Sequence, residues 1–301
     1  MKLYTCDRFL PPDLPAECVA ARIGLISDTH MPDRCPALPP TLFEVLLGVD
    51  ALLHAGDVGE LWVLDRLSAI APVIAVHGND DTADAQRELP YQQVLAVAGQ
   101  RIVLTHAHYP DRARELESRK DDRWAPKLER RVAFGDRAGA SVVIFGHTHV
   151  PMSLQCGDVL LVNPGAIAAP NYVTRQRVQS VALLFIRDDG VPAVVHLDLA
   201  APAQSFVPRI DWPAGFAAAH SQFTESIMAP DLEIIWKELH HVGQSLDEDV
   251  RAELRAGMRR ILERCWSGQQ ALISRADVLA EARAARLPDE MRVRIESMMT
   301  S

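Results

Sequence analysis

Residues 142–149 read Val-Val-Ile-Phe-Gly-His-Thr-His, a short apolar run that ends in a glycine and two histidines. Runs of four to eight apolar residues bounded by glycine, proline or aspartate are typical of buried strands. A pair of histidines at i and i+2 after such a strand has few structural uses. We therefore expect residues 142–145 to form a buried strand, with chemically active side chains at its carboxyl end.

Four other apolar runs end in the same way. They are Ile23–Ser27 before Asp28-Thr29-His30, Ala51–His54 before Gly56-Asp57, Pro72–Val76 before Gly78-Asn79-Asp80, and Ile102–Thr105 before His106-Ala107-His108. Each cluster alone is a weak signal, because Asp-x-His and Gly-Asp are ordinary in turns. Open α/β sheets, however, bind ligands outside the carboxyl ends of their strands. Five such clusters, each at a strand end, therefore predict one shared crevice. An extended backbone would point Asp28 and His30 to the same side, and likewise His147 and His149.

Segments with helical spacing lie between these runs, at residues 41–48, 60–69 and 125–138. Further apolar runs predict strands at 93–97, 159–162, 178–186 and 193–199. Gly99-Gln100 between two of the strands predicts a tight hairpin turn. The alternation of strands and helices indicates an α/β domain with added antiparallel hairpins.

The character of the sequence changes near residue 200. We expect an irregular lead-in at 1–21, a domain at 22–200, a proline-containing linker at 201–215 and a helical C-terminal domain at 216–301. Capping boxes at Ser245 and Ser274 predict two of the helix starts in that last part. The apolar stripes of these helices predict that they pack against another apolar surface, which the sequence does not identify. A substrate cap, a homo-oligomer interface and a partner-docking module all stay open.

Composition excludes several classes of protein. The 301 residues are 48% hydrophobic and 24% charged, which is ordinary for a globular chain. No apolar run approaches the ~18 residues needed to span a bilayer, and the start lacks the apolar core of a secretory signal. The net charge of −9 makes long nucleic acid an unfavourable partner. Five cysteines without a CxxC pair indicate a reducing compartment, so we expect a cytoplasmic protein.

The polar residues at the strand ends have the chemistry of metal ligands. Imidazole, carboxylate and amide oxygen together suit borderline divalent metals such as Mn, Fe, Zn or Ni. Seven ligands are too many for one ion and suit two ions with one shared carboxylate. Paired ions of this kind activate water for attack on phosphorus. The predicted ligands are Asp28, His30, Asp57, Asn79, His106, His147 and His149.

In this ordered combination the chain closely resembles the calcineurin-like metallophosphoesterases over residues 22–199. Ser27-Asp-Thr-His, Thr105-His-x-His, Gly146-His-Thr-His-x-Pro and Asn163-Pro-Gly are similar to the small bacterial and archaeal phosphodiesterase branch. The resemblance implies a four-layer α/β/β/α sandwich. It also implies one metal, with Mn first among the candidates, on Asp28, His30 and His149. A second metal would lie on Asn79, His106 and His147, with Asp57 bridging the two.

The chain departs from this pattern at Asp80. Many members of the superfamily carry a histidine there, which protonates the leaving oxygen. An aspartate is ionised at neutral pH unless its surroundings raise its pKa. This favours diesters or activated substrates and puts generic monoesterase activity in doubt. Asp80 and His108 are the candidate catalytic residues beside the metal ligands. The family's usual arginine after the proline of a later loop is also absent, because Pro170 is followed by Asn171.

Residues 111–131 hold eight basic and six acidic residues and must emerge beside the site. A lid that grips anionic substrate is one interpretation. A solvated helix with i,i+4 ion pairs is the one we favour.

The sequence thus predicts a dinuclear metal-dependent phosphoesterase, most of all a phosphodiesterase acting on small phosphodiesters or nucleotide derivatives. The alternatives are a binding or scaffold module on the same fold, which would have lost metal ligands, and a phosphomonoesterase or nuclease of the superfamily.

Overall fold

The computed structural model describes residues 5–244 and 247–300. The chain forms two compact units. The first consists of residues 1–170 and 176–224, and the second of residues 171–175 and 225–301. These bounds differ from the domains expected from the sequence, because residues 201–224 belong to the first unit and the short segment 171–175 belongs to the second.

The first unit contains a six-stranded sheet in the order β12-β11-β10-β1-β2-β3. The strands β1, β2 and β3 are parallel, so their carboxyl ends lie at one edge of the sheet. The strands β10, β11 and β12 extend the sheet in antiparallel fashion. The bounds are β1 Val19–Ile26, β2 Ala51–His54, β3 Val73–Ala75, β10 Ser180–Arg187, β11 Pro192–Asp198 and β12 Ser205–Phe206.

A second, five-stranded sheet has the order β4-β5-β6-β8-β7. Its central strands β5, β6 and β8 are parallel. The hairpin β4–β5 turns at Ala98 and Gly99, both with positive φ. This confirms the predicted tight turn, one residue earlier than expected, because Gln100 already belongs to β5. The bounds are β4 Gln92–Val97, β5 Gln100–Thr105, β6 Val142–Phe145, β7 Met152–Cys156 and β8 Val159–Asn163.

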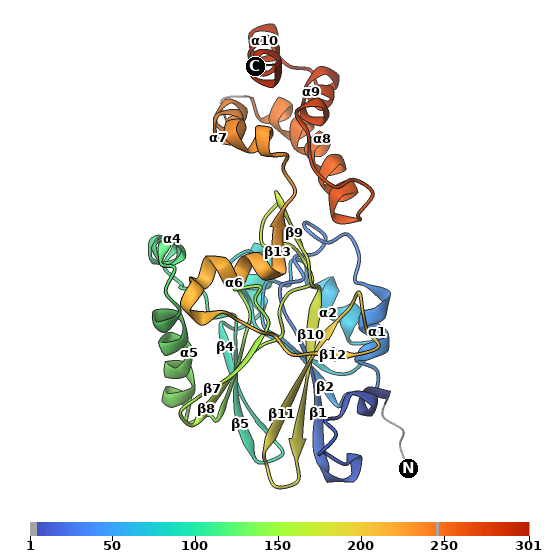
Figure 1. Ribbon diagram of the computed structural model, residues 1–301, viewed down its shortest axis with the longest axis vertical. Coiled ribbons are helices and arrows are strands. Elements are labelled where there is room, and N and C mark those ends of the chain that lie inside the picture. The colour runs from blue at the N-terminus through green and yellow to red at the C-terminus, as the bar shows by residue number, and fades with distance from the viewer. Residues whose placement is uncertain (1–4, 245–246, 301) are drawn as a thin grey trace. The chain divides into compact units, whose positions relative to one another are not determined.

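The two sheets pack face to face through a buried aliphatic cluster that includes Leu25, Leu53, Leu104 and Ile144. A second cluster joins the outer face of the six-stranded sheet to α1 (Pro40–Val45) and α2 (Trp62–Leu67). A third joins the outer face of the five-stranded sheet to α5 (Trp124–Ala138) and α6 (Gly215–Phe223). Figure 1 shows α5 along the outer side of that sheet. The predicted four-layer α/β/β/α sandwich is confirmed.

Several elements have no strong signal in the sequence. The edge strand β7 is short and has few β-branched residues. The helix α3 (Ala83–Glu88) is only six residues long and begins at a Thr82 cap. The helix α4 (Arg112–Lys120) is highly charged and lacks an apolar stripe. Local pattern therefore located the long buried elements and missed the short and polar ones.

The second unit is helical, with α7 Pro230–Gln244, α8 Glu248–Trp266, α9 Arg275–Ala284 and α10 Asp289–Thr300. Its buried cluster includes Leu232, Ile261, Cys265 and Met298. The capping box at Ser274 is confirmed, with Asp277 as its partner. The box expected at Ser245 lies outside the described residues. The strands β9 (Thr174–Gln176) and β13 (Thr224–Ser226) form a separate two-stranded sheet.

Within the described residues, no helix is both long and apolar enough to cross a membrane.

His196 couples stability to pH in the first unit. It lies on β11, is 2% exposed, and its Nε2 donates to the carbonyl oxygen of Asn163 at 2.9 Å. Burial lowers the pKa of His196 to about 4, from 6.5. Because the folded pKa is the lower one, protonation favours the unfolded chain. The stabilisation is complete above pH 6.5 and disappears as the pH falls toward 4. At about 1.4 kcal/mol per pKa unit, the loss is about 3 kcal/mol.

The variant His196→Gln keeps a donor for Asn163 but cannot titrate. Urea unfolding at pH 7 and pH 4.5, with excess chelator, measures the free energy of unfolding of both proteins. We expect the acid-induced loss to be about 2 kcal/mol smaller in the variant. Equal losses in the two proteins would show that His196 is not a source of acid sensitivity.

Candidate metal centre

The loops that follow five parallel strands converge at one place in the first unit. The loops after β1, β2 and β3 come from the six-stranded sheet, and the loops after β5 and β6 come from the five-stranded sheet. Three groups of side chains could each hold a metal ion, because the potential ligand atoms within each group all lie within 4.8 Å of one another. Two of the three groups combine residues from the loops of both sheets. The groups are Asp28 with His30 and His149, Asp28 with Asp57 and His106, and His30 with Asp57 and Asp80.

The backbone that presents these side chains is not extended. The strands β1 and β6 end at Ile26 and Phe145, before the predicted ligands begin. Five predicted ligands have positive φ, at 54°, 43°, 51°, 72° and 55° for Asp28, His30, Asp57, His147 and His149. The expectation that extended backbone aligns each i, i+2 pair was wrong. Left-handed turns aim the side chains instead, at a conformational cost of about 1 kcal/mol or more per residue.

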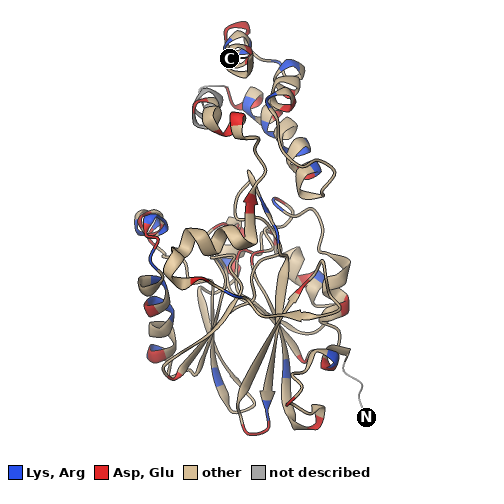
Figure 2. Ribbon diagram, in the orientation of Figure 1, with Lys and Arg blue, Asp and Glu red and all other residues tan. Residues whose placement is uncertain are grey.

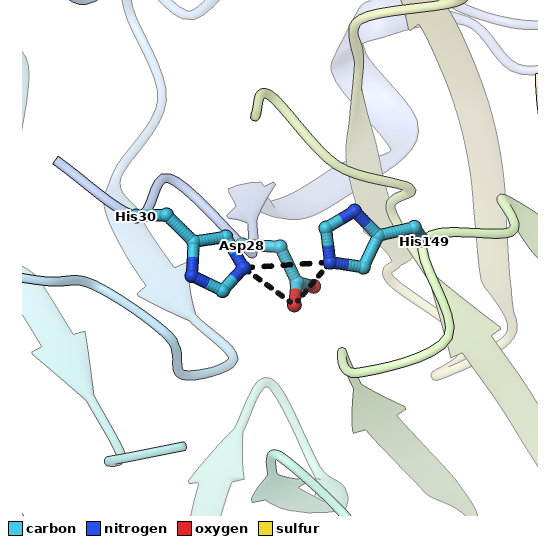
Figure 3. Close-up of side chains that lie close together, drawn as sticks. All are labelled: Asp28, His30 and His149. Carbon is cyan, nitrogen blue, oxygen red and sulfur yellow. Dashed lines mark hydrogen bonds and ion pairs between the residues drawn. The ribbon is translucent and has the colours of Figure 1, made fainter. Parts of the chain in front are cut away.

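Asp28, His30 and His149 form one of these groups, and all three are buried (Figure 3). His149 Nε2 lies 3.2 Å from Asp28 Oδ1, and His30 Nε2 lies 3.8 Å from the same oxygen. The two Nε2 atoms are 3.4 Å apart. The three ligand atoms thus face one small volume, at separations that suit coordination of a common ion.

Asp57 connects this group to the other strand ends. Its Oδ2 lies 3.5 Å from His30 Nε2 and 3.2 Å from His106 Nε2. Its Oδ1 accepts a hydrogen bond from the backbone N–H of Asp80 at 2.8 Å. One carboxylate oxygen therefore lies between a residue that follows β1 and a residue that follows β5.

The remaining predicted ligands are Asn79, His106 and His147. The Nδ1 of His106 donates to the carbonyl oxygen of Ala55 at 2.8 Å, which directs Nε2 toward Asp57. The rings of His106 and His147 are 5.0 Å apart, edge to face. The Nδ2 of Asn79 donates to Asp80, and its Oδ1 is buried without a hydrogen-bond partner among the described residues. A buried amide oxygen without a partner is costly unless it meets a cation.

Two glycines allow the loops to approach this closely. A Cβ on Gly78 would lie 2.0 Å from Asp57 Oδ1 and 2.5 Å from its backbone nitrogen. A Cβ on Gly146 would lie 2.0 Å from Ser27 Oγ and 2.7 Å from the carbonyl oxygen of Ala55. Both positions require the absence of a side chain.

The electrostatics of the centre favour positive charge. Burial alone would raise the pKa of Asp28, but contact with His149 outweighs it and holds that pKa below its ordinary range. Burial would lower the pKa of His106, but Asp57 outweighs it and raises the pKa to about 10. The two buried carboxylates thus stabilise a cation between them and the histidines. A divalent metal ion meets this requirement, and the donor set fits one.

Asp80 is more exposed than the other site residues, with a side chain 37% exposed. Its Oδ2 accepts a hydrogen bond from Arg34 Nη2 at 2.6 Å, and its Oδ1 accepts one from Asn79 Nδ2 at 2.7 Å. Both carboxylate oxygens therefore act as hydrogen-bond acceptors in these contacts. The catalytic role predicted for Asp80 stays a prediction, and its contacts indicate a role in orienting Asn79.

Arg34 is a site residue that the sequence did not reveal. Its Nη2 lies 2.5 Å from His30 Nδ1, and its Nη1 donates to the carbonyl oxygens of Ala169 and Pro170. A guanidinium therefore lies at the loop where the family's usual arginine is absent. The only sequence signal was its position four residues after His30.

His108 is buried, and its Nδ1 has no hydrogen-bond partner among the described residues. Burial, with His106 and His147 nearby, lowers the pKa of His108 to about 3. Its ring centroid lies 6.5 Å from that of His147. The structure places it beside the centre, and its catalytic role also stays a prediction.

The solvated helix with i,i+4 ion pairs that we favoured for residues 111–131 is confirmed in part. These residues form two helices, α4 and the first half of α5, and α4 is largely exposed, with an i,i+4 pair between Arg119 and Glu115. Glu115 itself, however, is buried. Its Oε1 lies 2.9 Å from His147 Nε2. No pattern in the sequence distinguishes Glu115 from the five other acidic residues of the segment.

The chain is similar to known proteins of one family. Residues 22–189 match the model of the calcineurin-like phosphoesterase superfamily domain. A probable metallophosphoesterase of Methanocaldococcus jannaschii is 35% identical over 168 residues, 55% of this chain and 76% of that protein. A phosphodiesterase of Escherichia coli is 32% identical over 117 residues, 36% of this chain and 52% of that protein. Among solved structures, vacuolar protein sorting 29 of Cryptosporidium parvum is 21% identical, with a TM-score of 0.49 over 62% of this chain and 95% of that one.

The family model covers more than half of the chain, and its span contains all five strand-end clusters. The chain therefore belongs to the calcineurin-like phosphoesterase superfamily, a family of metal-dependent phosphoesterases.

Proposed function

We propose that the protein is a dinuclear metal-dependent phosphodiesterase that hydrolyses small phosphodiesters or nucleotide derivatives. Its main support is the position of Asp57 Oδ2, 3.5 Å from His30 Nε2 and 3.2 Å from His106 Nε2. A carboxylate shared in this way is the feature that distinguishes a paired site from a single one.

In this proposal, Asp28, His30 and His149 hold one ion, and Asn79, His106 and His147 hold the other. Asp57 contributes to both. Manganese is the first candidate, with iron, zinc and nickel as alternatives, because imidazole and oxygen ligands suit all four. The Oδ1 of Asn79 is buried and has no hydrogen-bond partner in the part of the chain that the structure describes. This supports the second position, since an amide oxygen can bind a metal and the amide nitrogen of Asn79 already donates to Asp80.

When bound, paired divalent ions polarise phosphoryl oxygens and activate water. The protein's own residues position the ions. They also determine whether a proton donor is available for the leaving group of the substrate. Arg34 and Asn79 both donate to Asp80, so both of its carboxylate oxygens already act as hydrogen-bond acceptors. A substrate with a good leaving group needs no strong proton donor. Diesters and activated phosphates therefore suit the site better than unactivated monoesters.

Similarity to a phosphodiesterase of Escherichia coli supports this choice of substrate class. The presence of all seven predicted ligands weighs against a scaffold that has lost its metal site. Figure 2 shows that acidic and basic residues alternate along α4 and α5. With a net charge of −9, this mixture weighs against a nuclease acting on long nucleic acid.

Hydrolysis of bis(p-nitrophenyl) phosphate and of p-nitrophenyl phosphate tests the proposal. The protein is stripped of metal and reloaded with Mn²⁺ before both substrates are measured. We expect the diester to be the better substrate and turnover to require metal. The variant His149→Ala removes a ligand of the first group and should lose at least about 100-fold in kcat/KM, as expected when metal-assisted catalysis fails.

The matched control is His196→Gln, which changes a buried histidine of β11 outside the ligand set, keeps a donor for the Asn163 carbonyl and should retain wild-type activity at pH 7. Turnover that survives both metal removal and His149→Ala would contradict the proposal. Faster hydrolysis of the monoester would contradict the substrate preference and make His108 the first candidate proton donor.

The variant Gly78→Ala tests the ligand geometry without removing a ligand. The new Cβ would displace the Asp57 carboxylate, which lies 2.0 Å from its position. We expect Mn²⁺ affinity to fall about 10- to 100-fold, the range typical when a ligand's support is disturbed. Equilibrium dialysis with elemental analysis measures the bound metal.

Thr82→Ala serves as the control for general destabilisation. It removes the side-chain cap of α3, three residues beyond Asn79, at a cost of about 1 kcal/mol. Its metal binding should match the wild type. Unchanged affinity in Gly78→Ala would show that Asp57 does not hold the metal.

A further inference from the structure

Glu115 is buried in a helix that is otherwise exposed. It is 1% exposed and is the one buried residue of α4, whereas the neighbouring Leu116 is 46% exposed. Packing alone would turn the leucine inward, because burying a carboxylate is costly unless it is paired. The orientation of α4 therefore buries the Glu115 carboxylate and leaves Leu116 exposed.

Both oxygens of this carboxylate have partners. Oε1 accepts a hydrogen bond from Arg119 Nε at 2.7 Å and lies 2.9 Å from His147 Nε2. Oε2 accepts a hydrogen bond from the backbone N–H of Tyr109 at 2.9 Å. Tyr109 comes from the loop after β5 and His147 from the loop after β6. Glu115 thus ties α4 to two of the loops that build the centre.

The contact with His147 determines where the imidazole carries its proton. An ionised carboxylate only accepts hydrogen bonds, so Nε2 of His147 must be the donor. A neutral imidazole protonated at Nε2 has its lone pair on Nδ1. Nδ1 is then the atom with which His147 can bind a metal. A carboxylate that holds the far nitrogen of a ligating histidine also increases that ligand's basicity.

We propose that Glu115 is a positioning residue, which fixes the tautomer and the orientation of His147 so that Nδ1 is its metal-binding atom. This inference rests on the proposed function, because it takes His147 as a ligand of the second ion. In this proposal α4 supports the metal centre through Glu115, although the helix contributes no metal ligand.

Two readouts test the role. In metal-free protein, long-range ¹⁵N–¹H NMR correlations report the tautomer of each histidine. We expect His147 to be protonated at Nε2 in the wild type and to lose this preference in Glu115→Ala. For metal binding, electron paramagnetic resonance counts free Mn²⁺ during titration. We expect the first Mn²⁺ to bind Glu115→Ala as it binds the wild type, and the second to bind about 10- to 100-fold more weakly.

Glu115→Gln retains an acceptor for His147 and should weaken the second Mn²⁺ less than Glu115→Ala does. Glu117→Ala is the matched control, because Glu117 lies on the same helix with a side chain 74% exposed and pairs with Lys120. It should match the wild type in both readouts, so a change confined to Glu115 variants cannot come from the net charge of α4.

The outcomes separate the two proposals. A wild type that binds fewer than two Mn²⁺ ions would contradict the dinuclear function itself. A wild type that binds two ions, with Glu115→Ala equally tight at both, would overturn the role of Glu115. Protonation of His147 at Nδ1 in the metal-free wild type would overturn it as well, whatever the metal affinity. Should Glu115→Ala fail to fold, the Mn²⁺ affinity of Glu115→Gln and the tautomer of His147 in the wild type still test the role of Glu115.

Discussion

The carboxylate of Asp57 is the contact on which the centre depends. It is 3% exposed, and it lies against His30 from one loop, His106 from another and the backbone of Asp80 from a third. Burying such a charge is unfavourable unless cations or donors surround it. The surrounding loops must therefore close upon Asp57 together, and the close approach of Gly78 is part of that closure.

Each of the two sheets has a set of parallel strands, and these sets bring the loops together around Asp57. The backbone N–H of Asp28 donates to the carbonyl oxygen of Gly56 at 3.0 Å, and that of His30 donates to Asp57 at 2.9 Å. The parallel pairing of β1 with β2 thus continues past the strands into the functional loops. Beyond this pairing, left-handed residues turn the side chains toward the opposite sheet. The sandwich supplies rigidity, and the loops bear the strain that the site requires.

The sequence predicted the buried strands and the seven candidate ligands because both depend on local pattern and order. Val142–Phe145 and the residues after it are an example, since a buried strand and its polar end are adjacent in the chain. Family resemblance then grouped the ligands into two sets. Their backbone conformation was not predictable in this way, because the backbone N–H of His147, which has positive φ, donates to Asp28, and this contact forms only in the folded chain.

Contacts between distant polar residues were also beyond local pattern. Glu115 lies in a segment with eight basic and five other acidic residues, and only the fold turns it toward His147. Arg34 reaches Asp80 across 46 positions in the chain. Such residues have no periodicity of their own. They are found only once the loops are placed, and they are the ones that orient the ligands.

Anomalous X-ray diffraction from crystals of the Mn²⁺-loaded protein tests the central claim most directly. The account predicts two peaks about 3.5–4 Å apart, the spacing of paired catalytic metals. Both should lie in contact with Asp57, one beside His30 and His149 and the other beside His106 and His147. A single peak, or two peaks that do not share Asp57, would contradict it.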